Sequence, residues 1–124
     1  MNNSTLKLPA VADELSRSAK HIFGDKLRKI ILYGSYARGD YNQHSDMDIM
    51  VLADFDESEK SSLETQMRKI ASRASMDYDI TISMLVRTEK VFRERTTILP
   101  YYKNVATEGV ELYGAEKGTV GASF

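Results

Sequence analysis

Residues 29–52 read KIILYGSYARGDYNQHSDMDIMVL, two apolar runs joined by a polar segment. The first run ends at Gly34-Ser35, and ten residues separate Ser35 from Asp46-Met-Asp48, which opens the second run. Unbroken apolar runs of this length are typical of central strands that are covered on both faces. The stretch therefore predicts a strand, a tight corner, a polar loop and a second strand.

Apolar periodicity extends this pattern along the chain. We expect helices over residues 9–23, 36–41, 58–75, 88–95 and 100–109, and strands over residues 27–33, 46–53, 80–86 and 110–113. This order predicts an α/β (α+β) fold with one domain over residues 1–113, in which helices pack against a mixed β-sheet of about three to four strands. Residues 114–124 are small and polar, and we expect a disordered tail there.

The composition excludes several kinds of protein. The 124 residues carry a net charge of -1 and contain no cysteine, so disulfides and thiolate metal sites are excluded. Without clustered Lys and Arg, direct nucleic-acid binding is not expected. No apolar run approaches the roughly 20 residues that a membrane span needs, and the N-terminus does not resemble a signal peptide. We therefore expect a cytoplasmic protein that does not contact the membrane.

Two or three carboxylates form a candidate metal site. Residues two apart in a strand point to the same face, so Asp46 and Asp48 are expected to project together. Their repulsion, on the order of 4 kcal/mol at 4 Å, favours a neutralising cation. Asp79, directly before the third apolar run, is the expected third ligand; Asp77 has the same strand parity and is the less favoured choice. Hard oxygen ligands favour Mg²⁺, with Mn²⁺ possible.

The Gly34-Ser35 corner suits an anion. Glycine permits close backbone approach, and a helix that starts here directs N–H groups at a phosphate. Arg38, one turn later, is placed to reach a phosphate oxygen. A triphosphate on this corner, beside carboxylates that hold two metal ions, indicates phosphoryl or nucleotidyl transfer. In that scheme Asp46 and Asp48 hold both ions, and Asp79 holds only the catalytic one.

These residues resemble the DNA polymerase β-type nucleotidyltransferase superfamily. Within it, Tyr33-Gly-Ser-Tyr-Ala-Arg-Gly-Asp40 and Ser45-Asp-Met-Asp-Ile-Met-Val51 are similar to the minimal nucleotidyltransferases, and the resemblance covers residues 9–113. It implies an antitoxin that silences a HEPN-domain ribonuclease toxin by transferring AMP from ATP to a toxin tyrosine (AMPylation). Ser45 joins Gly34, Ser35 and Arg38 among the nucleotide-binding candidates, although a role in forming the turn is the more expected one for Ser45.

Other readings of the function stay open. The chain leaves no room for the added acceptor domain of larger relatives, so a protein acceptor is expected. A non-catalytic antitoxin that occludes its toxin by binding is one alternative, and a small-molecule (aminoglycoside-type) adenylyltransferase is another. Tyr101 and Tyr102 suit either a partner interface or packing on the sheet.

Overall fold

The computed structural model describes residues 3–114 and 119–120 of the chain. Its helices are α1 (Asn3–Phe23), α2 (Ser35–Arg38), α3 (Lys60–Tyr78), α4 (Glu89–Thr96) and α5 (Pro100–Glu108), with short 3-10 turns η1 (Gly24–Lys26) and η2 (Glu57–Glu59). Its strands are β1 (Leu27–Tyr33), β2 (Met47–Ala53), β3 (Ile82–Thr88), β4 (Val110–Gly114) and β5 (Thr119–Val120). The predicted α+β class is confirmed. Among the described residues, no helix combines the length and apolarity that a membrane crossing requires.

The strands form one mixed sheet in the order β3-β2-β1-β4-β5. β1 lies antiparallel to both β2 and β4, whereas β2 and β3 are parallel. The strand β1 ends at Tyr33, whose partner on β2 is Asp48. On the other side of Asp48, its partner on β3 is Ser83. The corner after β1 and the start of β2 therefore meet at one end of the sheet.

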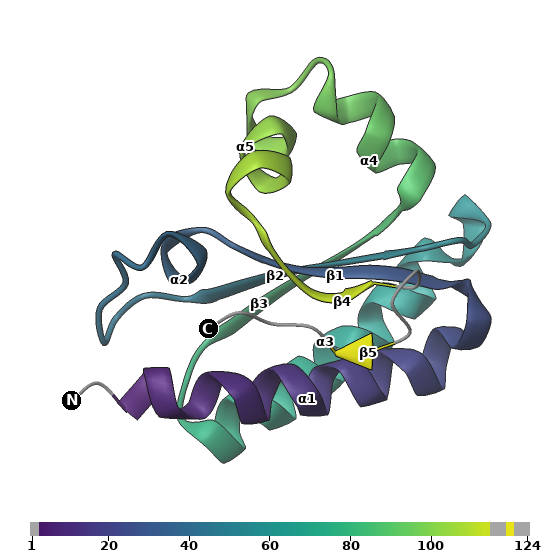
Figure 1. Cartoon of the computed structure of the whole chain (residues 1–124). Coiled ribbons are helices and arrows are strands. Elements are labelled where there is room, and N and C mark those ends of the chain that lie inside the picture. The colour runs from purple at the N-terminus through teal and green to yellow at the C-terminus, as the bar shows by residue number, and fades with distance from the viewer. Residues whose placement is uncertain (1–2, 115–118, 121–124) are drawn as a thin grey trace.

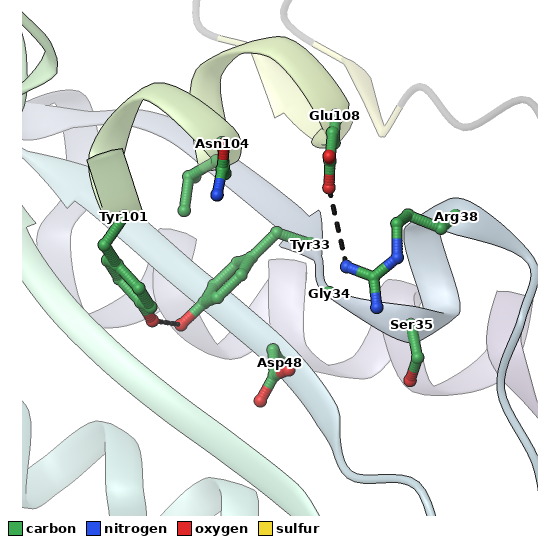
Figure 2. A pocket seen from close by; sticks show the side chains of 9 residues that line it. Tyr33, Gly34, Ser35, Arg38, Asp48, Tyr101, Asn104 and Glu108 are labelled. Carbon is green, nitrogen blue, oxygen red and sulfur yellow. Dashed lines mark hydrogen bonds and ion pairs between the residues drawn. The ribbon is translucent and has the colours of Figure 1, made fainter.

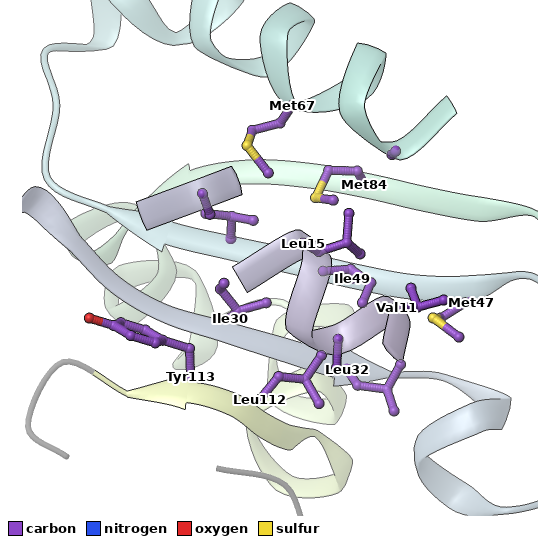
Figure 3. Close-up of a cluster of buried hydrophobic side chains, with 14 of the residues drawn as sticks. Val11, Leu15, Ile30, Leu32, Met47, Ile49, Met67, Met84, Leu112 and Tyr113 are labelled. Atoms are coloured by element: carbon purple, nitrogen blue, oxygen red, sulfur yellow. The ribbon is translucent and has the colours of Figure 1, made fainter. Parts of the chain in front are cut away.

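Helices cover both faces of the sheet (Figure 1). α1 and α3 pack on one face over the larger core, seen in Figure 3, which includes Val11, Leu15, Ile30, Leu32, Ile49, Met67 and Leu112. α4 and α5 stand over the opposite face, where a smaller core holds Ile31, Tyr33, Met50, Leu52, Tyr102 and Val105. Two covered faces explain why the apolar runs of β1 and β2 do not alternate.

Several predicted boundaries differ from the structure. The first helix begins at Asn3, so Pro9 lies inside α1 and not in its first turn. The short helix begins at Ser35, one residue before the predicted start, and ends at Arg38 because Gly39 adopts a left-handed conformation. β2 begins after Asp46.

The ends of the third predicted strand are also displaced. β3 begins at Ile82, and Asp79 is the C-cap of α3, directly after its last residue Tyr78. Of the expected tail, Gly114 ends β4 and Thr119–Val120 form β5, whereas residues 115–118 and 121–124 lie outside the described part of the chain. Disorder of the tail stays a prediction.

Candidate active site

The corner between β1 and α2 brings the glycine and a carboxylate into contact. Gly34 has φ +75° and ψ -153°, a backbone conformation open only to glycine. The Oδ2 atom of Asp48 lies so close to the Cα of Gly34 that a Cβ at this position would overlap it. The phosphate-binding corner and the metal-ligand candidate that the sequence predicts are therefore adjacent.

An open cleft of about 600 Å³ surrounds this contact. Its lining comes from the end of β1, from α2, from β2 and from α5: Tyr33, Gly34, Ser35, Arg38, Asp48, Tyr101, Asn104, Val105 and Glu108. Figure 2 shows the side chains of Ser35 and Arg38 on one side of Asp48 and the hydroxyl groups of Tyr33 and Tyr101 on the other. Four predicted site residues thus line one cleft.

Asp48 is the half-buried acid of the cleft. Burial raises the pKa of its carboxyl group, and the nearby charge of Asp46 raises it further, whereas Arg38 opposes the shift. Asp46 itself is exposed, precedes β2 and does not line the cleft. The two carboxylates are close enough for their charges to interact, as the sequence predicts, but they differ in exposure.

Arg38 carries the positive charge of the cleft. Its Nε lies 3.2 Å from Asp40 Oδ2 and its Nη1 lies 3.5 Å from Glu108 Oε2. The Asp40 carboxylate first, and Glu108 second, raise the pKa of the guanidinium. Both ion pairs are at the surface and contribute little to stability, so the guanidinium can exchange Glu108 for a phosphate oxygen.

Two tyrosines form the opposite side of the cleft. The hydroxyl groups of Tyr33 and Tyr101 share a hydrogen bond of 2.6 Å, and their rings meet edge to face with centroids 5.8 Å apart. Burial, followed by the hydrogen bond to Tyr101, raises the pKa of Tyr33. Tyr101 is 48% exposed.

Tyr102 has a different environment from Tyr101. It is buried, and its hydroxyl accepts hydrogen bonds from Arg87 Nε at 3.1 Å and Arg95 Nη1 at 2.9 Å. Burial opposes ionisation, but the hydrogen bonds and charges of these two arginines lower the pKa of Tyr102. Of the two tyrosines, Tyr102 packs beneath α5 and Tyr101 faces the cleft.

Asp79 and Ser45 lie elsewhere. They line a separate pocket with His44 and Met76. Ser45 closes its own loop, because its Oγ accepts a hydrogen bond from the backbone N–H of Asn42 at 2.9 Å. Within residues 3–114 and 119–120, no group of three or more His, Cys, Asp or Glu side chains is placed to hold a metal ion. The expected convergence of Asp79 on Asp46 and Asp48 is therefore absent, since the residue beside Asp48 on β3 is Ser83.

Several cleft residues were not predicted from the sequence. The sequence predicts Tyr33 as the end of a strand and includes it in the motif that carries the resemblance, but gives it no role in the site. It predicts Asn104 and Glu108 only as part of a helix. For Tyr33 a signal exists, since it directly precedes Gly34 at the end of β1 and must lie beside the corner. For Asn104 and Glu108 there is none, because nothing local says that α5 folds back over β1.

A glycine corner, a cationic side chain and the Asp48 carboxylate around one open cleft, with Asp46 close to Asp48, are typical of a nucleotide-transferring α+β domain. Residues 12–112 match the model of the nucleotidyltransferase domain family. The chain belongs to this family and is a nucleotidyltransferase.

Known proteins similar to the chain agree with this family. This chain is 33% identical to a Methanocaldococcus jannaschii protein named "Putative protein adenylyltransferase". The match covers 83% of this chain and 99% of that protein. A crystal structure of a toxin-antitoxin with AMP-PNP superposes with a TM-score of 0.56 and 25% identity, covering 86% of this chain and 76% of that one. The structure of tri-AMPylated Shewanella oneidensis HEPN toxin in complex with MNT antitoxin shares the fold (TM-score 0.51, 22% identity, 88% and 74% covered).

The carboxylates fit a nucleotide-bound divalent cation. The raised pKa of Asp48 reflects its burial first and the neighbouring charge of Asp46 second, and a cation would offset both. Mg²⁺ is usually bound by one or two carboxylates together with substrate phosphates and water. Asp48 lies against the glycine corner and Asp46 is close enough for its charge to act on Asp48, so these two residues supply that number of carboxylates. A metal-binding role of Asp79 stays a prediction.

Proposed function

We propose that this nucleotidyltransferase transfers AMP from ATP to a tyrosine hydroxyl of a partner HEPN toxin and thereby neutralises the toxin, in a reaction that depends on Mg²⁺. The observation that carries the proposal is the cleft in which Asp48 separates the Gly34-Ser35 corner from an open side lined by Tyr101. The protein adenylyltransferase name of a relative and the toxin-antitoxin complexes of similar fold support it.

Different residues of the site would bind the phosphates and the metal ion. Gly34 and Ser35 bind the β- and γ-phosphates, and Arg38 leaves Glu108 to donate to a phosphate oxygen. Asp46 and Asp48 hold Mg²⁺, which, when bound, supplies stabilisation of the negative charge on the phosphates. Mn²⁺ suits the same oxygen ligands.

The open side of the cleft suits a macromolecular acceptor. Just before and within the first turn of α5, Ile98, Leu99 and Tyr101 are 73%, 42% and 48% exposed. Apolar side chains exposed together mark interaction sites on many proteins. A partner protein docked here would present its own tyrosine to the cleft. The cytoplasmic location expected from the sequence stays a prediction.

The test is an intact-mass assay of a candidate HEPN partner, taken from the gene next to that of this chain, incubated with the enzyme, ATP and Mg²⁺. We expect the partner to gain one or more AMP units with the wild-type enzyme and none with Asp48→Asn. A stable complex that silences the toxin without any mass gain would overturn the proposal in favour of occlusion. Modification of a free aminoglycoside in place of the partner would overturn it in favour of a small-molecule transferase.

A further inference from the structure

We infer that Tyr101 is itself an acceptor, so that the enzyme attaches AMP to its own α5 within the cleft. The inference rests on the proposed function, because it uses the same nucleotide and the same carboxylates. It concerns a different product, a covalent modification of this chain.

The position of the Tyr101 hydroxyl supports this inference. It lies 2.6 Å from the hydroxyl of Tyr33, whose backbone partner across the sheet is Asp48. Directly opposed residues of antiparallel strands have Cβ atoms about 4.5–5.5 Å apart on one face. Tyr33, Tyr101 and Asp48 also line the same cleft, and the charge of Asp48 acts on the Tyr33 hydroxyl. Tyr101 therefore enters the cleft of the carboxylate that we assign to the metal from α5, without any partner protein.

The direction of approach is also suitable. In nucleotidyl transfer the attacking oxygen and the departing pyrophosphate lie roughly in line on opposite sides of the phosphorus. In Figure 2, Ser35 and Arg38 lie on one side of Asp48, and the tyrosine hydroxyls lie on the other. A nucleotide with its β- and γ-phosphates on the corner would thus turn its α-phosphate toward the hydroxyl of Tyr101.

The reaction balances without a further reactant. A bond forms between Tyr101 Oη and the α-phosphorus of ATP, and the bond from that phosphorus to the bridging oxygen of the β-phosphate breaks. Pyrophosphate leaves with the electron pair, and the phenolic proton passes to water, which reaches Tyr101 because the residue is 48% exposed. The products are AMP-Tyr101 and pyrophosphate.

The neighbouring tyrosines are poorer acceptors. Tyr33 is only 6% exposed, so its hydroxyl has little room to carry an AMP group. Tyr102 is equally buried, and its hydroxyl already accepts hydrogen bonds from two arginines. In contrast, Tyr101 needs only to leave its hydrogen bond to Tyr33, while its ring stays at the open mouth of the cleft.

The experiment incubates the purified full chain alone with ATP and Mg²⁺, and measures its intact mass and then the modified peptide. We expect a gain of one AMP that maps to Tyr101, with a rate constant independent of protein concentration. Tyr101→Phe keeps the ring and should remove the label, whereas Tyr113→Phe, on buried β4, should keep it. The thermal shift caused by AMP-PNP shows that each variant still folds and binds nucleotide.

A parallel arm with the HEPN partner separates this inference from the proposed function. AMP on the partner with none on this chain would overturn the inference and leave the proposed function standing. Label on a tyrosine other than Tyr101, or a rate constant that rises with protein concentration, would also overturn it. Label on Tyr101 with none on the partner would support the inference and count against the toxin as acceptor.

Discussion

The carboxylate of Asp48 rests against the Cα of Gly34, so the residue that begins the phosphate corner also makes room for the metal-ligand candidate. Gly34 directly follows β1 and Asp48 lies on β2, and the antiparallel pairing of Tyr33 with Asp48 brings them together. A side chain at Gly34 would therefore disturb both halves of the site at once.

We expect Gly34→Ala to abolish nucleotide binding. The new Cβ would displace the Asp48 carboxylate, and the positive φ would add strain of about 1–3 kcal/mol. Thermal unfolding with and without ATP and Mg²⁺ measures both effects. Gly24→Ala is the matched control, because Gly24 has φ +58° but no atom within 4 Å of an added Cβ. The control should lose stability yet keep its ATP-induced shift; an intact shift in Gly34→Ala would contradict the assignment.

Asp48→Asn should remove activity and stabilise the metal-free protein. Burial and the charge of Asp46 raise the pKa of Asp48 above its ordinary value of 3.8. A group with a raised pKa in the folded state disfavours folding once it ionises, so wild-type stability falls as pH rises through that pKa. In EDTA at pH 7 the variant should therefore melt higher than wild type, by about 1–4 °C. The difference should close below pH 3.8, and a lower melting temperature at pH 7 would contradict the argument.

Asp79→Asn should keep AMP transfer within about threefold of wild type, against a loss of 100-fold or more for Asp48→Asn. Asp79 lies outside the cleft, and asparagine tolerates the φ of +52° found there. Asp77→Asn, in the last turn of α3, is the matched control. A loss as large as that of Asp48→Asn would restore Asp79 as a metal ligand and require the loop before β3 to move when nucleotide binds.

Asp79 also shows where the sequence is informative and where it is not. Apolar runs predicted β1 and β2 within one residue, because burial on both faces leaves no other role for them. The start of β3 was placed two residues early. Here the backbone N–H groups of Asp79 and Ile80 both bond to the carbonyl of Ser75, which closes α3, and this local helix ending outweighs the apolar alternation.

The far side of the cleft was beyond a sequence argument for another reason. Tyr33 and Tyr101 are 68 positions apart, and their contact depends on how α5 packs against β1. Local patterns predict that α5 is a helix but not which strand it covers. The half of the site formed by β1, α2 and β2 was therefore predictable, and the half formed by α5 was not.

A buried acid on α3 connects the edge of the sheet to α5. β3 is an edge strand of the sheet. Glu64 Oε2 accepts a hydrogen bond from the N–H of Val86, at 3.0 Å, and forms an ion pair with Arg87 Nη1, also at 3.0 Å. Arg87 in turn donates to Tyr102 of α5. Glu64 thus stabilises the edge strand and, through Arg87, the helix that lines the cleft.

We expect Glu64→Gln to lower the free energy of unfolding by about 1–3 kcal/mol at pH 7. Burial opposes ionisation of Glu64, but the Val86 N–H, Arg68 and Arg87 outweigh it and lower the pKa below its ordinary value of 4.5. A lowered pKa in the folded state contributes stability that is present above pH 4.5 and is lost as pH falls through the folded value. Urea unfolding of both proteins from pH 7 to pH 3 measures this.

The gap between wild type and Glu64→Gln should therefore shrink as the solution is acidified and close once both side chains are neutral. Glu57→Gln, an exposed acid on η2, is the matched control and should stay close to wild type throughout. A gap that persists unchanged to pH 3 would mean that the amide fails for steric reasons. In that case the charge of the Glu64 carboxylate would not be the source of its stabilising contacts with β3 and, through Arg87, with α5.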